Sequence, residues 1–115
     1  MSESVEQLPF SAFQEELRHV ARFIAAATSA NPLDAVVSAI RKNPALNQER
    51  LLTRILAACI GRQVTFRRAE VAAFDREHLG LLVALMDARA AGTHTETEWV
   101  RAADEADATQ RDIDG

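Results

Sequence analysis

The sequence predicts an all-α fold, a compact bundle of five to six short helices. Of its 115 residues, 22 are alanine, the residue with the highest helix propensity. Apolar residues recur at helical spacing, and Asn-Pro pairs and glycines stand where such stretches begin and end. A chain of this length is expected to form one domain. We place that domain at residues 11–108, between a flexible N-terminal segment at 1–10 and a frayed acidic tail at 109–115.

The first helix is expected from about Ser11 to Thr28. Ser11 and Gln14 have the spacing of a capping box, in which the two side chains bond the free amides of the first turn. A regular apolar stripe follows, typical of a helix with one face on the core. Its members are Phe13, Leu17, Val20, Ala21 and Ile24.

Asn31-Pro32 predicts the start of a second helix, because asparagine caps helices well and proline suits the first helical position. Asn43-Pro44 ends it, since the residue before a proline avoids helical geometry. The expected buried row is Leu33, Val36, Val37 and Ile40.

A third helix is expected to start with Asn47 as its cap, with Leu46 and Leu51 placed to form a hydrophobic staple. Gly61 should end it in the left-handed conformation that glycine adopts readily. Between them lie two apolar rows, Leu51-Ile55-Cys59 and Leu52-Leu56-Ile60. A bundle this small has difficulty covering both rows, so the sequence also suggests a homodimer.

Residues 62–74 leave two alternatives open. Gln63 to Phe66 could form a short extended piece, whereas Arg67 to Phe74 reads as two helical turns with Val71 and Phe74 facing inward.

Asp75 is expected to cap a fifth helix over about 76–91, which Gly92 ends. Its apolar residues spread over most of its surface, which predicts that it and the third helix form the centre of the bundle. Gly80 inside this helix costs ~1 kcal/mol relative to alanine, and we attribute it to the close approach of a neighbouring helix.

The last helix should begin at a second capping box, formed by Thr95 and Glu98. It carries the single tryptophan, Trp99. Beyond Ala108 the sequence has no apolar stripe.

Charge is strongly segregated along the chain. Residues 41–68, here called the arginine segment, carry a net charge of +6, whereas residues 1–40 carry −3 and residues 69–115 carry −7. Such segregation creates a local field that the total of −4 conceals. The basic residues are Arg41, Lys42, Arg50, Arg54, Arg62, Arg67 and Arg68, against the single acid Glu49.

The charge pattern favours a non-catalytic module for protein–protein interaction or regulation, of inhibitor, immunity or adaptor type. The candidate partner-binding residues are Arg50, Arg54, Arg62, Arg67, Arg68 and Trp99. For Trp99 the alternative, which we favour, is that it docks the last helix on the bundle. The arginines could equally be a solvated face that neutralises the acidic ends of the same molecule.

A nucleic-acid-binding accessory protein is the alternative function. Residues 67–91 could then form a helix-turn-helix with its second helix at 76–91. Against this, that helix is mostly apolar and the pI is about 5.3, whereas dedicated nucleic-acid binders are usually basic.

The sequence predicts neither an enzyme nor a bound cofactor or metal. Its four glycines are too scattered for a phosphate-binding loop or a dinucleotide fingerprint. Cys59 lies on the apolar arc of the third helix and should pack as a small hydrophobic residue. Three histidines lie on separate elements without a ligand-spaced partner: His19, His78 and His94.

The location expected from the sequence is the cytoplasm. One cysteine allows no internal disulfide, the N-terminal residues lack the basic character of a signal peptide, and no apolar run is long enough for a membrane span. Twelve arginines against one lysine suggest a GC-rich bacterial genome.

Overall fold

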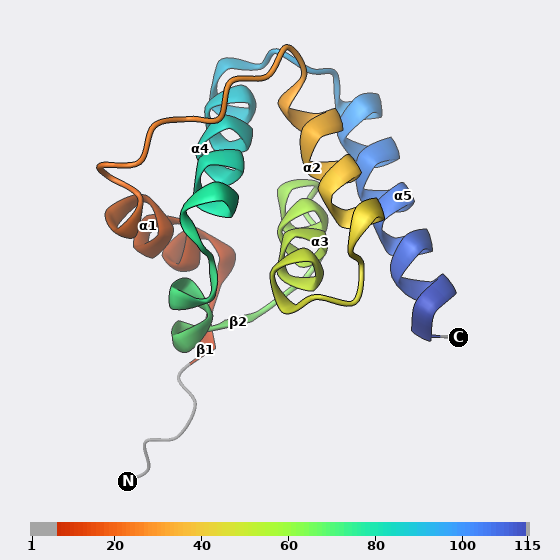
Figure 1. Cartoon of the computed structure of the whole chain (residues 1–115), viewed down its shortest axis with the longest axis horizontal. Coiled ribbons are helices and arrows are strands. Elements are labelled where there is room, and N and C mark those ends of the chain that lie inside the picture. Colours follow the sequence, from red (N-terminus) through yellow and green to blue (C-terminus); the bar gives the residue numbers. More distant parts are fainter. Residues whose placement is uncertain (1–6, 115) are drawn as a thin grey trace, which may run out of the picture.

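The computed structural model describes residues 7–114 and confirms the all-α prediction. Helices α2, α3, α4 and α5 pack together, and α1 lies with the short helix η1 at the other side of α4 (Figure 1). In chain order the elements are β1 (Gln7–Leu8), α1 (Phe10–Val20), α2 (Pro32–Lys42), α3 (Asn47–Cys59), β2 (Phe66–Arg67), η1 (Arg68–Ala73), α4 (Arg76–Ala91) and α5 (Glu96–Asp114).

The chain has regular structure before the first predicted helix. Strand β1 pairs antiparallel with β2, so that Leu8 lies opposite Phe66. Leu8 is 6% exposed. The prediction of a flexible segment at 1–10 is therefore wrong for residues 7–10, and residues 1–6 lie outside the described residues.

Helix α1 is shorter than predicted. It begins after Pro9 without a side-chain cap, so the predicted capping box does not form, and it ends at Val20. Residues 21–31 cross over α4 instead (Figure 1). There the Ala27 amide donates to the Gly80 carbonyl at 2.9 Å. Gly80 thus accommodates a non-helical segment, and the expectation of a neighbouring helix was wrong.

Helix α2 forms as predicted. The Asn31 side chain accepts a bond from the Asp34 amide at 3.0 Å, and Pro32 is the first helical residue. The whole predicted apolar row is buried: Leu33, Val36, Val37 and Ile40.

Helix α3 starts one residue earlier than predicted. Leu46 takes the cap position without a side-chain bond, so Asn47 is the first helical residue and not the cap. Leu46 is 54% exposed, so the predicted staple does not bury it. Gly61 does end the helix at a φ of 86°, and its amide and that of Arg62 bond the carbonyls of the last turn.

The apolar rows of α3 are covered within one chain. Leu51, Leu52, Ile55 and Leu56 are each at most 3% exposed. Cys59 and Ile60, at the ends of the two rows, are half-buried. The rows therefore give the homodimer less support than expected, and the homodimer stays a prediction.

Residues 62–74 combine both predicted alternatives. Phe66 and Arg67 form strand β2, and η1 follows as a 3-10 helix, not the predicted α-helix. Val71 and Phe74 are buried, as expected.

Helices α4 and α5 follow their predicted starts. The Asp75 side chain caps α4 by accepting from the His78 amide at 2.9 Å, and α4 buries most of its surface. Thr95 and Glu98 form the reciprocal capping box at 2.8 and 3.1 Å. Helix α5 continues to Asp114, so the prediction of a frayed tail at 109–115 is wrong for the part that the structure describes.

Candidate functional site

Three of the predicted site residues converge on one pocket of about 520 Å³. Arg50 and Arg54 come from α3, and Arg67 comes from β2. We call this the arginine pocket; η1 and the C-terminal part of α5 complete its walls. Its other lining residues are Asn47, Leu51, Thr53, Ala69, Glu70, Ala73, Asp107 and Gln110.

The arginines of the segment are paired with carboxylates, most of which come from distant parts of the chain. The ion pairs are Arg41–Glu105 (3.4 Å), Arg50–Asp114 (3.0 Å), Arg54–Glu70 (2.7 Å), Arg62–Asp104 (2.6 Å), Arg62–Asp107 (2.7 Å), Arg67–Glu70 (3.6 Å) and Arg68–Glu16 (3.0 Å). The charge segregation of the sequence is therefore largely balanced in space. Exposed pairs of this kind are weak because water and salt screen them, so another carboxylate can exchange with them at small cost.

The Arg54–Glu70 pair is the most ordered part of the arginine pocket. Arg54 also donates to the Thr65 carbonyl and lies over the ring of Phe66, 5.0 Å from its centroid. Burial alone would raise the pKa of Glu70, but bonds from Arg54 and from the Arg67 amide outweigh it and lower the pKa. Glu70 therefore stays charged and holds Arg54 in place.

The other predicted site residues lie outside this pocket. Arg62 is bound to α5 and Arg68 to α1 through the ion pairs above. Trp99 is 1% exposed and lies beneath the Arg89 guanidinium, 4.9 Å from its ring centroid. Its burial confirms that it docks α5 on the bundle, and it offers almost no surface to a partner.

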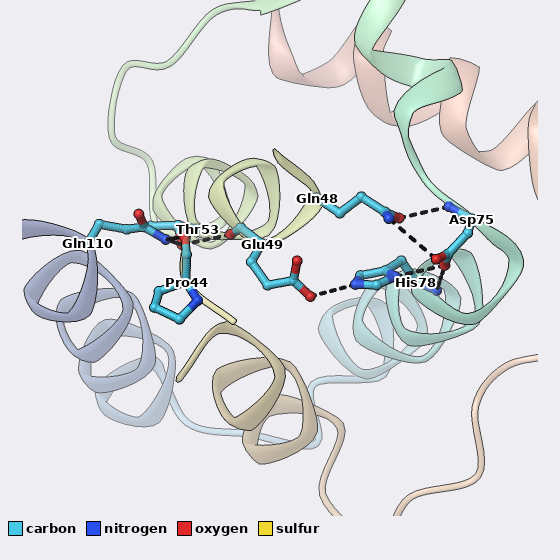
Figure 2. Close-up of polar contacts among 7 residues, drawn as sticks. All are labelled: Pro44, Gln48, Glu49, Thr53, Asp75, His78 and Gln110. Carbon is cyan, nitrogen blue, oxygen red and sulfur yellow. Dashed lines mark hydrogen bonds and ion pairs between the residues drawn. The ribbon is translucent and has the colours of Figure 1, made fainter. Parts of the chain in front are cut away.

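A second polar cluster joins the starts of α3 and α4 (Figure 2). His78 Nε2 lies 2.6 Å from Glu49 Oε2, and His78 Nδ1 lies 2.7 Å from Asp75 Oδ1. Gln48 Oε1 accepts from the Asp75 amide at 2.7 Å, and Gln48 Nε2 donates to Asp75 Oδ2 at 3.3 Å. We call these four residues the clasp.

The clasp shifts the proton affinities of its members. Burial opposes the charged imidazole, but the bonds to Glu49 and Asp75 outweigh burial and raise the pKa of His78. The bond from the His78 amide, followed by that from its ring, lowers the pKa of Asp75 to about 2. Both ring nitrogens are engaged, so His78 has no nitrogen left to act as a general base toward a substrate.

Sequence reasoning missed the clasp. Asp75 and His78 are three residues apart, but Glu49 is 29 residues from His78, and no spacing rule predicts that contact. One signal was present: Glu49 precedes Leu52 and Leu56 by three and seven residues, which places a carboxylate on the buried row of α3. A charged residue there requires a partner.

The part of the chain that the structure describes gives little support for a reactive cysteine, a metal site or a membrane span. Burial raises the pKa of Cys59 to about 11, and Arg89 opposes the shift, in keeping with the predicted core role. No set of three or more histidine, cysteine or acidic residues among residues 7–114 is placed to hold a metal ion. Within the same residues, every helix is too short or too polar to cross a membrane.

The helix-turn-helix considered for residues 67–91 is not present. Its first helix is replaced by η1, a 3-10 helix of six residues. The candidate recognition helix, α4, is buried along most of its length, whereas a recognition helix must expose polar side chains to base edges.

Comparison of the chain with protein-family models, curated proteins and solved structures finds no match.

Proposed function

We propose that this chain is a non-catalytic module for protein–protein interaction or regulation, of inhibitor, immunity or adaptor type, whose arginine pocket receives acidic side chains of a partner. The observation that carries the proposal is the convergence of Arg50, Arg54 and Arg67 on one pocket. Guanidinium groups bind carboxylates through two parallel bonds, which gives both attraction and orientation.

The arginines of the pocket are paired within the chain, but the carboxylates of a partner can replace these internal carboxylates and so bind the pocket. Arg50 and Arg67 have side chains that are 42% and 57% exposed, so a partner can reach them without displacing Arg54 from Glu70, whose side chain is 14% exposed. Interactions of this type mainly set association rate and specificity. We therefore expect moderate affinity that falls with ionic strength.

Nucleic acid is the alternative partner, because phosphate oxygens suit the same guanidinium groups. Glu70 and Asp107 in the pocket wall repel a phosphodiester and a carboxylate alike, but a nucleic acid carries one negative charge at every nucleotide, and the net charge of −4 opposes its approach. A protein partner therefore remains our first proposal.

The test is selection from a displayed random-peptide library, followed by calorimetric titration of the selected peptides. We expect peptides rich in Asp and Glu. Their affinity should fall at least ~10-fold, about 1.4 kcal/mol, in the double variant Arg50→Ala/Arg67→Ala. Arg41→Ala is the matched control, since Arg41 is 57% exposed and paired but lies outside the pocket.

Two results would contradict the proposal. One is selection of peptides without acidic residues, and the other is equal loss of affinity in the control variant.

Duplex DNA is titrated in parallel by fluorescence anisotropy. Micromolar binding at about 150 mM salt, with a log–log slope near −0.9 per phosphate contact and lost in the double variant, would favour nucleic acid instead.

A further inference from the structure

The clasp places a titratable contact between two helices, where it can respond to pH. Glu49 belongs to the first turn of α3, and Asp75 and His78 belong to the start of α4 (Figure 2). We propose that the proton between Glu49 and His78 completes this junction of α3 and α4, and that its loss in alkaline solution loosens the start of α4.

The number of protons in the clasp follows from its donors and acceptors. Ionised carboxylates only accept hydrogen bonds, and a neutral imidazole has one N–H. The contacts at 2.6 Å to Glu49 and 2.7 Å to Asp75 therefore require two protons on the three groups. Whether the second proton is drawn on His78 Nε2 or on Glu49 Oε2, it lies between the same two atoms. Its loss leaves a lone pair of the ring facing one of the two carboxylates.

Loss of the proton leaves a neutral imidazole with one N–H for two carboxylates. The Glu49 side chain is 4% exposed, and its Oε1 has no hydrogen-bond partner among the described residues. Because an unpaired buried carboxylate is strongly unfavourable, the remaining N–H stays with Glu49. The lone pair of Nδ1 then faces Asp75, whose side chain is 56% exposed and can turn toward water. This repulsion weakens the Asp75 cap of α4 and its bond from Gln48 of α3, and so loosens the start of α4.

Neighbouring charges do not replace the lost proton. The charges that act on His78 within residues 7–114 are those of Glu49 and Asp75. Arg50 and Arg54 of α3 are engaged with Asp114 and Glu70. The charged side chains on the other elements packed around α4, and at its own start, are exposed: Arg22, Asp34, Arg41, Lys42, Arg76 and Glu77.

The pH range over which the clasp responds follows from the direction in which folding shifts the pKa of His78. The pKa of His78 in the folded protein is raised above its ordinary 6.5. A group with a raised folded pKa stabilises the fold fully below its unfolded pKa, and the contribution is lost as pH rises through the folded pKa. The clasp is therefore complete at about pH 6 and opens on the alkaline side.

The experiment is an NMR titration of the whole chain, with urea unfolding measured at the same pH values. We expect the His78 ring to titrate at higher pH than a free histidine, whose pKa is 6.5. The Cα shifts of Gln48, Asp75 and Leu79 should follow the His78 midpoint, those of Trp99 should not, and the free energy of unfolding should fall through the same transition.

Glu49→Gln separates the shared proton from simple packing. Its amide N–H can donate to a neutral His78 nitrogen, so the variant needs no extra proton there. We expect a lower pKa for His78 and a free energy of unfolding that no longer falls at this transition, while His19→Gln behaves as wild type. Titration of His78 at or below pH 6.5, or Cα shifts that ignore the His78 midpoint, would overturn the proposal. If Glu49→Gln does not fold, these wild-type measurements decide alone.

Discussion

The free energy that couples Glu49 to His78 can be estimated and measured. In His78→Ala, Glu49, which is 3% exposed in the native protein, loses its bonding partner. Breaking a buried ion pair in this way costs about 3–5 kcal/mol. We expect the lower end, about 3 kcal/mol, because the side chain of His78 is 13% exposed and water can reach that side.

The other two variants complete a double-mutant cycle. In Glu49→Ala the imidazole keeps Asp75, which is 56% exposed, so the loss should be about 2 kcal/mol, in the usual range for single substitutions. The double variant Glu49→Ala/His78→Ala leaves no stranded charge. It should therefore be more stable than the sum of the single losses implies, by about 2 kcal/mol of coupling energy.

Urea unfolding followed by far-ultraviolet circular dichroism and Trp99 fluorescence gives the four free energies at about pH 6, where the clasp is protonated. Repeating the cycle on the alkaline side of the His78 transition should reduce the coupling energy. A coupling energy below ~0.5 kcal/mol at pH 6, within the usual error of additivity, would refute this account of the clasp.

Three further predictions concern stability and reactivity. Trp99→Ala removes a side chain that is 1% exposed and should lower the free energy of unfolding by about 3–5 kcal/mol, measured in urea by circular dichroism. Gly80→Ala should raise it by up to about 1 kcal/mol, because the new Cβ would lie 3.4 Å from the Ala25 carbonyl oxygen, at ordinary contact distance; a loss in the same assay would show that the crossing segment cannot accept a methyl group. Cys59, with its pKa raised to about 11, should react with a disulfide reagent at about pH 8 at least ~10-fold more slowly in the native protein than in urea.

The sequence predicted best the features that depend on local chemistry. The capping bonds at Asp75, at Gly92 and in the Thr95–Glu98 box each reach a residue within about one turn. Propensity and spacing are sufficient for such contacts. The same holds for the buried row of α2, whose members share one face of a regular helix.

The errors in the fold came from contacts between distant residues. Alanines at 25–27 favour helix, but the Ala27 amide bonds Gly80 in α4, and this tertiary contact outweighs propensity. The end of α5 has no apolar stripe, yet Gln110 bonds the Pro44 carbonyl and Asp114 pairs with Arg50.

The candidate site was predictable only as a list of arginines. Sequence position could not show that Arg50, Arg54 and Arg67 share a pocket while Arg62 and Arg68 pair elsewhere. That division depends on where α5 and α1 place their carboxylates.

A single residue, the buried Phe74, separates η1 from the Asp75 cap of α4. The wall of the arginine pocket that carries Glu70 and Ala73 is therefore attached directly to the clasp. Thermodynamic linkage is reciprocal. If deprotonation of the clasp moves this wall and weakens the binding of an acidic ligand, then binding of that ligand must raise the proton affinity of the clasp. An acidic ligand should then draw protons from an alkaline solution as it binds, and the heat of its association should depend on the ionisation enthalpy of the buffer.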